Sequence, residues 1–451
     1  MPSHRNGPVR GRGVQLPLVL AGLLSLPGSL LGAAGLLQLA SPHLDPALAA
    51  FVYGVAVVGA AFMLAWAAEA VQVDISSSVA LGILALMTVL PEYAVDFVFA
   101  WRGGGDFQQF GPACQAPGAE GASSCSLALA TMTGANRLLI GVGWALVVFV
   151  AWIQWRRRGE PDRGMTMARS RSVELAYLAL ACAYSLTLPL KSTITLFDAI
   201  ILIGIFVAYT LRISKAPQVD PELIGPAAWI GGLPKRARRA TVLGLFVVAG
   251  AVILLVAEHF AQSLVDTGRE FGVSEFLLVQ WLAPIAAEAP ELLVVGLYAW
   301  RLKTDEALTT LVSSKVNKWT LLVGSLPVVF AISSGSLHGL PIQAGQREEV
   351  LLTAAQTVFA VAILVNLSLS IGEAAALFGL FSAQFIVGAM IPAEWHGAEL
   401  IIISAVYMVF GLWLILHRLG DFRDRLRDGF RTPFELMKPS TEPDHQSTRD
   451  R

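Results

Sequence analysis

Twelve apolar segments dominate this chain, and each has about the length that a helix needs to cross a lipid bilayer. Of the 451 residues, 55% are hydrophobic and only 14% are charged, whereas about 25% of a soluble domain is charged. Backbone groups in lipid must pair within their own segment, so such runs fold as helices. The sequence therefore predicts an all-α polytopic membrane protein. The expected spans lie near residues 14–38, 47–70, 75–101, 127–154, 173–189, 193–213, 240–260, 274–300, 306–333, 349–369, 371–391 and 398–417.

Basic residues gather in alternate connections between these spans. The two termini and every second connection hold 25 of the 32 Lys and Arg residues. This bias predicts that both termini are cytoplasmic, in a multi-pass protein of the plasma (cytoplasmic or inner) membrane. It also places Cys114 and Cys125 outside, where a disulfide and two free thiols both remain open. The basic runs are short and juxtamembrane, so no nucleic-acid partner is expected.

One motif occurs twice inside apolar segments. PEYAVDFVFAWR begins at Pro91 and PELLVVGLYAWR begins at Pro290, with six of twelve positions identical. Each copy places a carboxylate, Glu92 or Glu291, directly after a proline. The copies lie in the third and eighth spans, so they run in opposite directions across the membrane. A repeated, inverted, proline-broken carboxylate segment is typical of a transporter site near the bilayer midplane.

The helices that follow each copy also match. TMTGANRLLIGVG carries Thr133, Asn136 and Arg137, and SSKVNKWTLLVG carries Ser314, Asn317 and Lys318. Both follow the pattern hydroxyl-x-x-Asn-basic, which puts the hydroxyl and the Asn on one helix face. Hard cations such as calcium and sodium prefer oxygen ligands of these types. A carboxylate at such a site can also exchange protons, so the pattern indicates cation exchange or proton coupling.

These residues resemble the sodium/calcium exchanger membrane region, part of the calcium/cation antiporter superfamily, and indicate a divergent bacterial-type member. The resemblance implies two inverted five-helix repeats over about residues 47–391, with one extra helix at each end. The family's Gly-Thr-Ser-x-Pro-Glu motif matches at Thr88, Pro91 and Glu92 and again at Pro290 and Glu291. Its Asn motif matches at Gly134, Asn136 and Asn317. The resemblance implies that these Glu and Asn residues coordinate the transported cation, with Glu92 and Glu291 as the metal-binding carboxylates.

The chain departs from that family pattern mainly by adding charge. Glu288 replaces a serine of the second motif, and we expect it to join the site. Asp96 lies one turn after Glu92 and is either a site member or a helix-pairing contact. Arg137, Lys315 and Lys318 leave the four carboxylates with a balance of about one negative charge, which favours sodium or potassium exchanged for protons over calcium. We expect these three basic residues to compensate charge or gate the site, although Glu92 and Glu291 could instead form structural ion pairs with Arg137 or Lys318.

The predicted organisation follows from these spans and from the polar linkers between them. The expected units are a cytoplasmic N-terminus (1–13), an extra helix (14–38), the first repeat (47–213), a linker (214–239), the second repeat (240–391), another extra helix (398–417) and a cytoplasmic tail (418–451).

The predicted function is secondary cation antiport: calcium, sodium or potassium exchanged for sodium or protons by alternating access at a midplane carboxylate site. The alternative is a non-transporting membrane sensor or scaffold that retains the exchanger fold. No HExxH or Gly-x-Ser-x-Gly motif is present, so an enzyme is not expected. The expected partners are inorganic cations, protons and lipid, with no cofactor. Whether the protein forms a homo-oligomer stays open.

Overall fold

The structure is a computed structural model that describes residues 12–37, 44–74, 90–119, 121–161, 164–216, 223 and 225–437. Its main helices are α1 (Arg12–Leu36), α2 (Pro46–Val71), α4 (Leu90–Phe110), α5 (Ser124–Leu138), α6 (Ala145–Arg158), α7 (Ser172–Ser185), α8 (Leu196–Ile213), α9 (Pro226–Gly231), α10 (Lys235–Phe271), α11 (Glu275–Trp300), α12 (Thr304–Asn317), α13 (Val323–Ser334), α14 (Ala344–Ile363), α15 (Ile371–Met390), α16 (His396–His417) and α17 (Leu419–Phe430). Two π-helical segments, η2 (Leu139–Trp144) and η5 (Lys318–Leu322), and four two-residue strands complete the core.

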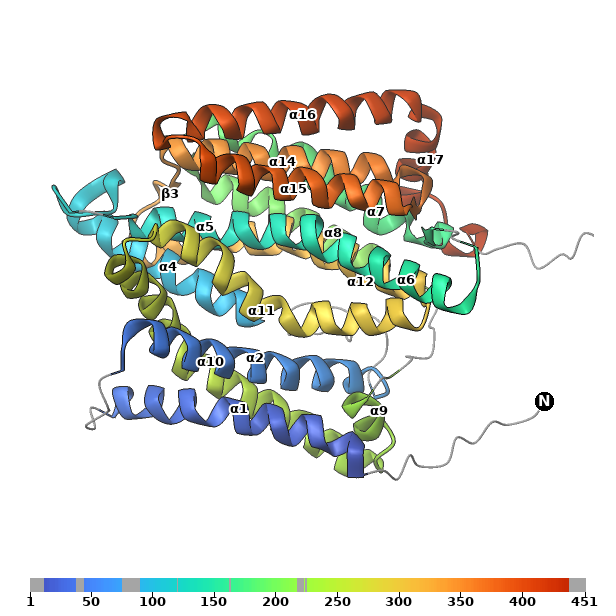
Figure 1. Ribbon diagram of the computed structural model, residues 1–451, viewed down its shortest axis with the longest axis horizontal. Coiled ribbons are helices and arrows are strands. Elements are labelled where there is room, and N and C mark those ends of the chain that lie inside the picture. Colours follow the sequence, from blue (N-terminus) through green and yellow to red (C-terminus); the bar gives the residue numbers. More distant parts are fainter. Residues whose placement is uncertain are drawn as a thin grey trace, which may run out of the picture.

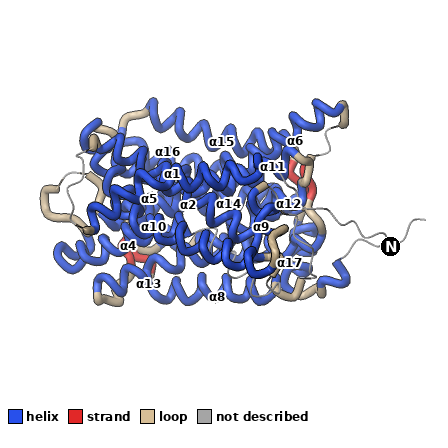
Figure 2. Tube along the Cα trace, turned by 90° about the horizontal axis from the view of Figure 1, so that it is seen from below, coloured by secondary structure: helices blue, strands red, loops and turns tan. Residues whose placement is uncertain are grey.

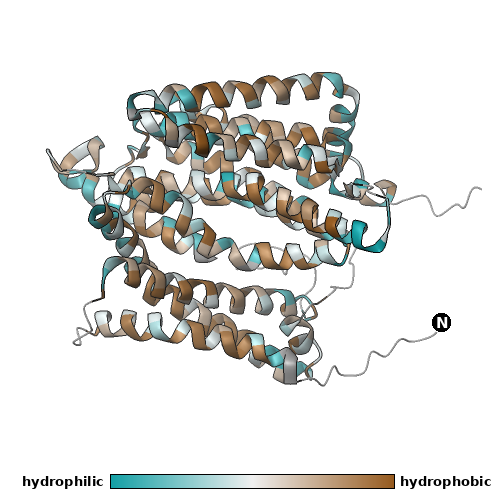
Figure 3. Cartoon of the chain, in the orientation of Figure 1, coloured by the Kyte–Doolittle hydropathy of each residue, from teal (hydrophilic) through white to brown (hydrophobic). Residues whose placement is uncertain are grey.

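The all-α membrane fold is confirmed. Within the described residues, ten helices are long and apolar enough to cross a bilayer, or eleven when the bent helix α11 is included. The first half of the predicted third span, residues 75–89, lies outside the described residues, and α4 forms its second half. The helices lie roughly parallel to one another (Figure 1). Figure 3 shows apolar residues along their middles and polar residues at both ends, as expected for a protein embedded in lipid.

Two predicted boundaries differ from the structure. Helix α4 continues to Phe110 rather than stopping near residue 101. Helix α10 has 37 residues, which corresponds to a length of about 55 Å. Because the hydrocarbon core is only about 30 Å thick, α10 extends into the connections at both of its ends. The expected linker 214–239 therefore contains α9 and the first turn of α10.

Helix α11 is broken in the way that its sequence predicts. Its two parts, Glu275–Ala289 and Glu291–Trp300, meet at an angle of 56°. Proline lacks a backbone N–H and clashes with the preceding turn, so Pro290 explains a bend at this point. The bend lies between the two carboxylates Glu288 and Glu291.

The inverted repeat is visible in small elements as well as in the long helices. Strand β1 (Met165–Thr166) pairs with β4 (Ser368–Leu369), and β2 (Thr193–Ile194) pairs with β3 (Leu340–Pro341). Each pair joins one half of the chain to the other, and the two pairs lie at opposite ends of the molecule (Figure 2). The π-helical segments η2 and η5 directly follow α5 and α12, which are the helices of the repeated Asn motif.

Helices α1, α2 and α10 pack side by side as a group at the lower edge of Figure 1. Helix α10 makes its most extensive helix packing with α2, and α1 covers both. The remaining long helices form the rest of the bundle, with α11 between the two parts. The candidate site residues described below lie on α11 and on α4, α5, α12 and η5 of the larger part.

The C-terminal segment differs from the solvated tail that its alternating charges suggest. Residues 419–430 form α17 and residues 434–437 form a further short helix, while 438–451 lie outside the described residues. Asp428 is buried and pairs with Arg169 (2.7 Å), and Arg212 donates to the backbone carbonyl of Gly429 (2.9 Å). The helix is therefore docked on α7 and α8 rather than free in solvent.

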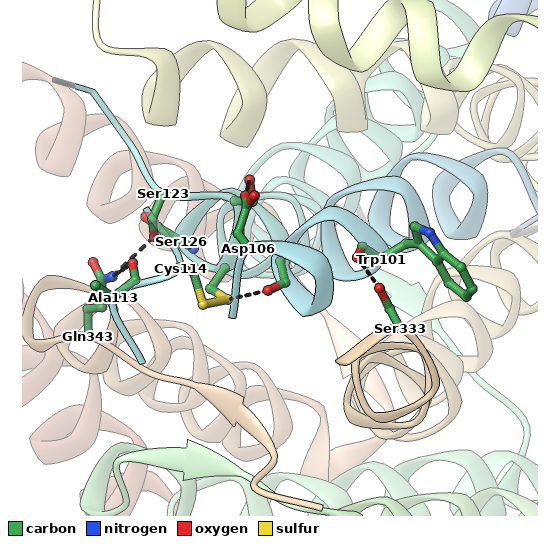
Figure 4. Close-up of a disulfide and its surroundings, with 11 residues drawn as sticks. Trp101, Asp106, Ala113, Cys114, Ser123, Ser126, Ser333 and Gln343 are labelled. Atoms are coloured by element: carbon green, nitrogen blue, oxygen red, sulfur yellow. Dashed lines mark hydrogen bonds between the residues drawn. A yellow bond between two sulfur atoms is a disulfide. The ribbon is translucent and has the colours of Figure 1, made fainter. Parts of the chain in front are cut away.

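Cys114 and Cys125 form a disulfide, which resolves the two possibilities left by the sequence. Figure 4 shows the bridge beside the end of α4. The loop is also held to the second half, because Gln343 donates to the carbonyl of Ala113 and to the hydroxyl of Ser123, both at 3.1 Å. In Figure 1 this loop lies at the opposite end of the molecule from α9, α17 and the N-terminus.

Candidate functional site

The start of α4, the bent helix α11 and two helices that become π-helical bring the repeated residues together. Glu92 lies in the first turn of α4, and Glu288 and Glu291 flank the bend of α11. Asn136 and Asn317 lie at the ends of α5 and α12, where the helices become π-helical. Prolines and π-helical segments interrupt regular backbone pairing, and such interruptions often mark functional sites in membrane helices.

Lys318 lies at the centre of the carboxylates. Its ammonium is 3.0 Å from Oε2 of Glu92 and donates a hydrogen bond to Oε1 of Glu288. The Lys318 residue is only 1% exposed. The ion pairs join α4 of the first half to α11 and the α12–η5 helix of the second. One of the structural pairs considered from the sequence, Glu92 with Lys318, is therefore present.

A second lysine, Lys315, contacts the Asn motif of the first half. Lys315 donates to both the backbone carbonyl (2.7 Å) and the side-chain Oδ1 (2.8 Å) of Asn136. The ammonium also lies 5.3 Å from the ring centre of Trp319. Oδ1 is the atom of the Asn136 side chain that could coordinate a cation. The ammonium of Lys315 therefore occupies a position where a cation bound to Asn136 would lie.

Glu291 has a different environment from Glu92. Ser314 on α12 donates to its Oε2 at 3.0 Å. Glu291, Ser314 and Asn317 line a cavity of ≈ 280 Å³ that also reaches Glu69 and Arg171. These three second-half members of the predicted site therefore border open space between the described helices, whereas Glu92 and Glu288 are not among the residues that line this cavity.

Tyr93 and Asp96 extend the cluster on α4. The hydroxyl of Tyr93 donates to Oδ1 of Asn317 at 3.1 Å, which links the two repeats. Asp96 is fully buried, and it lies with Glu92, Thr131 and Ala287 around a narrow gap between α4, α5 and α11. The structure thus places Asp96 beside the site. Thr88, the remaining predicted ligand, lies outside the described residues.

Arg137 does not share the position of Lys318, although the repeated pattern suggests a matching role. Its guanidinium is 2.5 Å from Oε2 of Glu349 on α14 and 5.0 Å from the ring centre of Trp281. Gln280 donates to both Glu349 and Thr133, each at 3.2 Å. Arg137 and Thr133 therefore belong to a separate buried network, and Arg137 does not form the ion pair with Glu92 or Glu291 that the sequence leaves open.

Several buried carboxylate oxygens have no hydrogen-bond partner in the described part of the chain. They include Oε1 of Glu92, Oε2 of Glu288 and Oε1 of Glu291. A buried unpaired carboxylate oxygen is costly, so such atoms suit a ligand that carries positive charge. Within the described residues, however, no three Asp, Glu, His or Cys side chains are arranged to hold a metal ion. The ammonium of Lys318 fills the point where Glu92 and Glu288 converge.

Sequence reasoning missed Tyr93, Gln280 and Glu349. Their only signal is that they are polar side chains in or beside apolar spans, and no repeat identifies their partners. Trp101 and Trp300 are exposed, as suits aromatic residues that face lipid headgroups. Arg102 instead pairs with Glu258 at 3.2 Å and donates to Gln262.

Comparisons with known proteins agree with this geometry. The profile of the sodium/calcium exchanger protein family matches residues 46–215 and 241–388. A comparison with curated protein sequences gave no match.

Among solved structures, the chain is 37% identical to that in a crystal structure of an H+/Ca2+ exchanger, CAX. That match covers 93% of this chain and 98% of the other, with a TM-score of 0.82. Two structures of YfkE, one of them described as a Ca2+/H+ antiporter protein, are 15% and 16% identical. They cover 86% and 87% of this chain and 99% of their own, with TM-scores of 0.56 and 0.54, and show the shared fold.

The family match spans both repeats and leaves out the segment between them, as expected if each half is one exchanger unit. We conclude that this chain belongs to the sodium/calcium exchanger protein family.

Proposed function

We propose that this protein is a secondary active antiporter that moves a cation across the membrane in exchange for protons or sodium. The observation that carries the proposal is the group of the buried Glu92 and Glu288 and the partly buried Glu291, contributed by both inverted repeats. Carboxylates at this depth are expensive and serve ion or proton pathways. The similarity to an H+/Ca2+ exchanger over nearly the whole chain supports the same assignment.

The transport unit in this proposal is the pair of repeats, residues 47–213 and 240–391. Alternating access would expose the carboxylates to one side of the membrane at a time. The cavity beside Glu291 and Ser314 offers a path to one end of the bundle, because it extends to Arg171 near the start of α7. Calcium, sodium and potassium are the candidate cargo, and the flux experiment below distinguishes them.

We also propose that both termini face the cytoplasm and that the protein resides in the cytoplasmic membrane. The distribution of basic residues supports this orientation. The disulfide supports it independently, because Cys114 and Cys125 lie at the end of the bundle opposite to α17, and disulfides persist in oxidising compartments.

The test is flux in liposomes that contain the purified protein. We expect calcium or sodium uptake driven by an imposed pH gradient or by an opposed sodium gradient. Glu92→Gln and Glu291→Gln should each abolish this exchange while the protein still folds, because each removes a charged ligand. Glu258→Gln is the matched control: Glu258 is exposed and pairs only at the surface, so its flux should equal that of the wild type. Normal exchange in Glu92→Gln or Glu291→Gln would refute the site assignment.

A second candidate function is a non-transporting sensor or scaffold. The ion pairs of Lys318 with Glu92 and Glu288 favour it, since they neutralise part of the site. A sensor would show no flux of any cation in liposomes, together with a cation-dependent rise in melting temperature. Measured antiport would exclude this alternative.

A further inference from the structure

The positive charge among the site carboxylates is supplied by the chain itself, by the ammonium of Lys318. Lys318 contacts Glu92 from one repeat and Glu288 from the other, and all three residues are buried. A mobile cation bound by both halves would make these same two contacts. The ammonium of Lys318 thus has the charge and the partners of a bound cation, but it is tethered to the helix that carries Asn317.

The basic residue of the second repeat contacts the site carboxylates, whereas the matching residue of the first repeat has another partner. Lys318 follows Asn317 as Arg137 follows Asn136, yet Arg137 turns outward to Glu349 on α14. Lys315 also reaches from the second half to the first, where it holds Asn136. Two first-half ligands of the predicted site, Glu92 and Asn136, are therefore engaged by ammonium groups from the second half. The second-half ligands Glu291 and Ser314 remain beside the cavity.

We propose that Lys318 is a tethered competitor of the transported cation. In the cargo-free protein its ammonium neutralises Glu92 and Glu288, the contacts seen in the structure. Cargo enters beside Glu291 and displaces the ammonium from these carboxylates as the site closes. The ammonium returns when the cargo leaves. This inference rests on the proposed antiport and adds to it a residue that governs cation affinity and the charge of the site on its return without cargo.

The physical reason is the cost of burying unpaired charge. Removing one partner of a buried ion pair is strongly unfavourable because the other charge is left without compensation. An empty site with Glu92, Glu288 and Glu291 all unpaired would therefore change conformation slowly in a low-dielectric membrane interior. Lys318 offsets one of these charges when no cargo is bound, which leaves less charge for the counter-ion of the exchange to neutralise. The same contact weakens cargo binding, since cation and ammonium compete for the same oxygens.

The experiment compares Lys318→Gln with Lys318→Arg and the wild type. Cation binding is measured in detergent as the sodium or calcium concentration that gives half of the maximal thermal stabilisation, with choline chloride as the ionic-strength control. Transport is measured in liposomes in two modes: isotopic self-exchange of the same cation, and net uptake driven by a pH gradient. Lys235→Gln, which changes an exposed lysine at the start of α10, is the matched control.

We expect Lys318→Gln to bind the cation about tenfold more tightly or better, because the competing charge is gone. Self-exchange should continue, since in this mode the site carries a cation in both directions. Net uptake should fall by about tenfold or more, because without the ammonium the site returns with one more uncompensated negative charge. Lys318→Arg keeps the charge and should restore net uptake toward the wild-type rate, and Lys235→Gln should match the wild type in all three measurements.

Unchanged affinity and unchanged net uptake in Lys318→Gln would overturn the inference while leaving the antiport intact. Loss of self-exchange together with net uptake in a folded Lys318→Gln protein would also overturn it, because Lys318 would then build the site. If Lys318→Gln does not fold, the charge-balanced pair Glu288→Gln with Lys318→Gln is measured for binding instead. Because Glu288→Gln also removes a cation ligand, this pair is compared with Glu288→Gln alone: tighter binding in the pair supports the inference, and equal or weaker binding refutes it. The binding measurement does not depend on transport, so an absence of wild-type flux would refute only the proposed function.

Discussion

At the residue scale, Gly134 explains how closely the site helices can approach. A Cβ atom at this position would lie 1.7 Å from the backbone carbonyl oxygen of Gln280. Backbone atoms of α11 cannot yield as a flexible side chain can. Helices α5 and α11 therefore cross at the one residue type that has no side chain, and this contact lies two residues before Asn136.

We expect Gly134→Ala to destabilise the protein by about 1–3 kcal/mol or more, because the added methyl group overpacks the crossing. Thermal unfolding of the purified protein in detergent measures the effect. Gly250→Ala on α10 is the control, since no atom lies within 4 Å of its added Cβ, and alanine is the better helix former. Equal melting of Gly134→Ala and the wild type would contradict the close crossing of α5 and α11.

Arg137 and Lys318 have different ion-pair partners, and this difference shows what a sequence can and cannot reveal about single residues. Their matching positions in the repeat predict matching jobs, and both are buried basic residues as expected. Their partners differ because Glu349 lies on α14, far along the chain, and repeat periodicity carries no information about such long-range contacts. The carboxylates Glu92 and Glu291 were identifiable because a charged group after proline in an apolar segment is costly wherever it packs.

At the scale of elements, α17 is the part that the sequence describes least well. Its alternating acids and bases resemble a solvated segment, but Asp428 is buried against Arg169 and Thr432. Alternating charge indicates a polar surface and does not exclude that one face docks on a neighbour. The long spans were easier to predict because about 20 consecutive apolar residues have few alternatives to a membrane helix.

The docking of α17 should depend on pH through Asp428. The hydrogen-bonded Arg169 guanidinium holds the pKa of this carboxyl below its usual range. The ionised form is therefore favoured in the docked state, and its contribution is complete above the unfolded carboxyl value of about 3.9 and is lost as the pH falls through the lower folded value. We expect α17 to stay docked at neutral pH and to loosen only in stronger acid.

Hydrogen exchange of residues 419–437, corrected for the intrinsic rate at each pH, measures this loosening. Asp428→Asn should expose the segment even at neutral pH, because the neutral side chain cannot form the ion pair with Arg169. Arg423→Gln, on the exposed face of α17, serves as the control. Wild-type protection in Asp428→Asn would mean that the ion pair does not hold the helix.

At the scale of the whole molecule, the proposed orientation can be tested by labelling from each side of the membrane. Gln109→Cys lies at the exposed end of α4 near the disulfide, and Arg423→Cys lies on α17 at the opposite end. A membrane-impermeant maleimide should label Gln109→Cys in intact cells and Arg423→Cys only after permeabilisation. The buried Cys182 and the bridged pair should stay unlabelled in both cases. The reverse pattern would invert the proposed orientation.

The two small strand pairs have a mechanical consequence for the whole protein. Met165 pairs with Leu369 at one end of the bundle, and Thr193 pairs with Pro341 at the other. Because the two repeats are paired at both ends of the bundle, their paired parts cannot slide past each other without breaking backbone hydrogen bonds. Among the described residues, helices α1, α2 and α10 carry no such strand tie. If the protein works by the proposed alternating access, α1, α2 and α10 are therefore the helices that can move relative to the remaining, strand-tied helices of the two repeats.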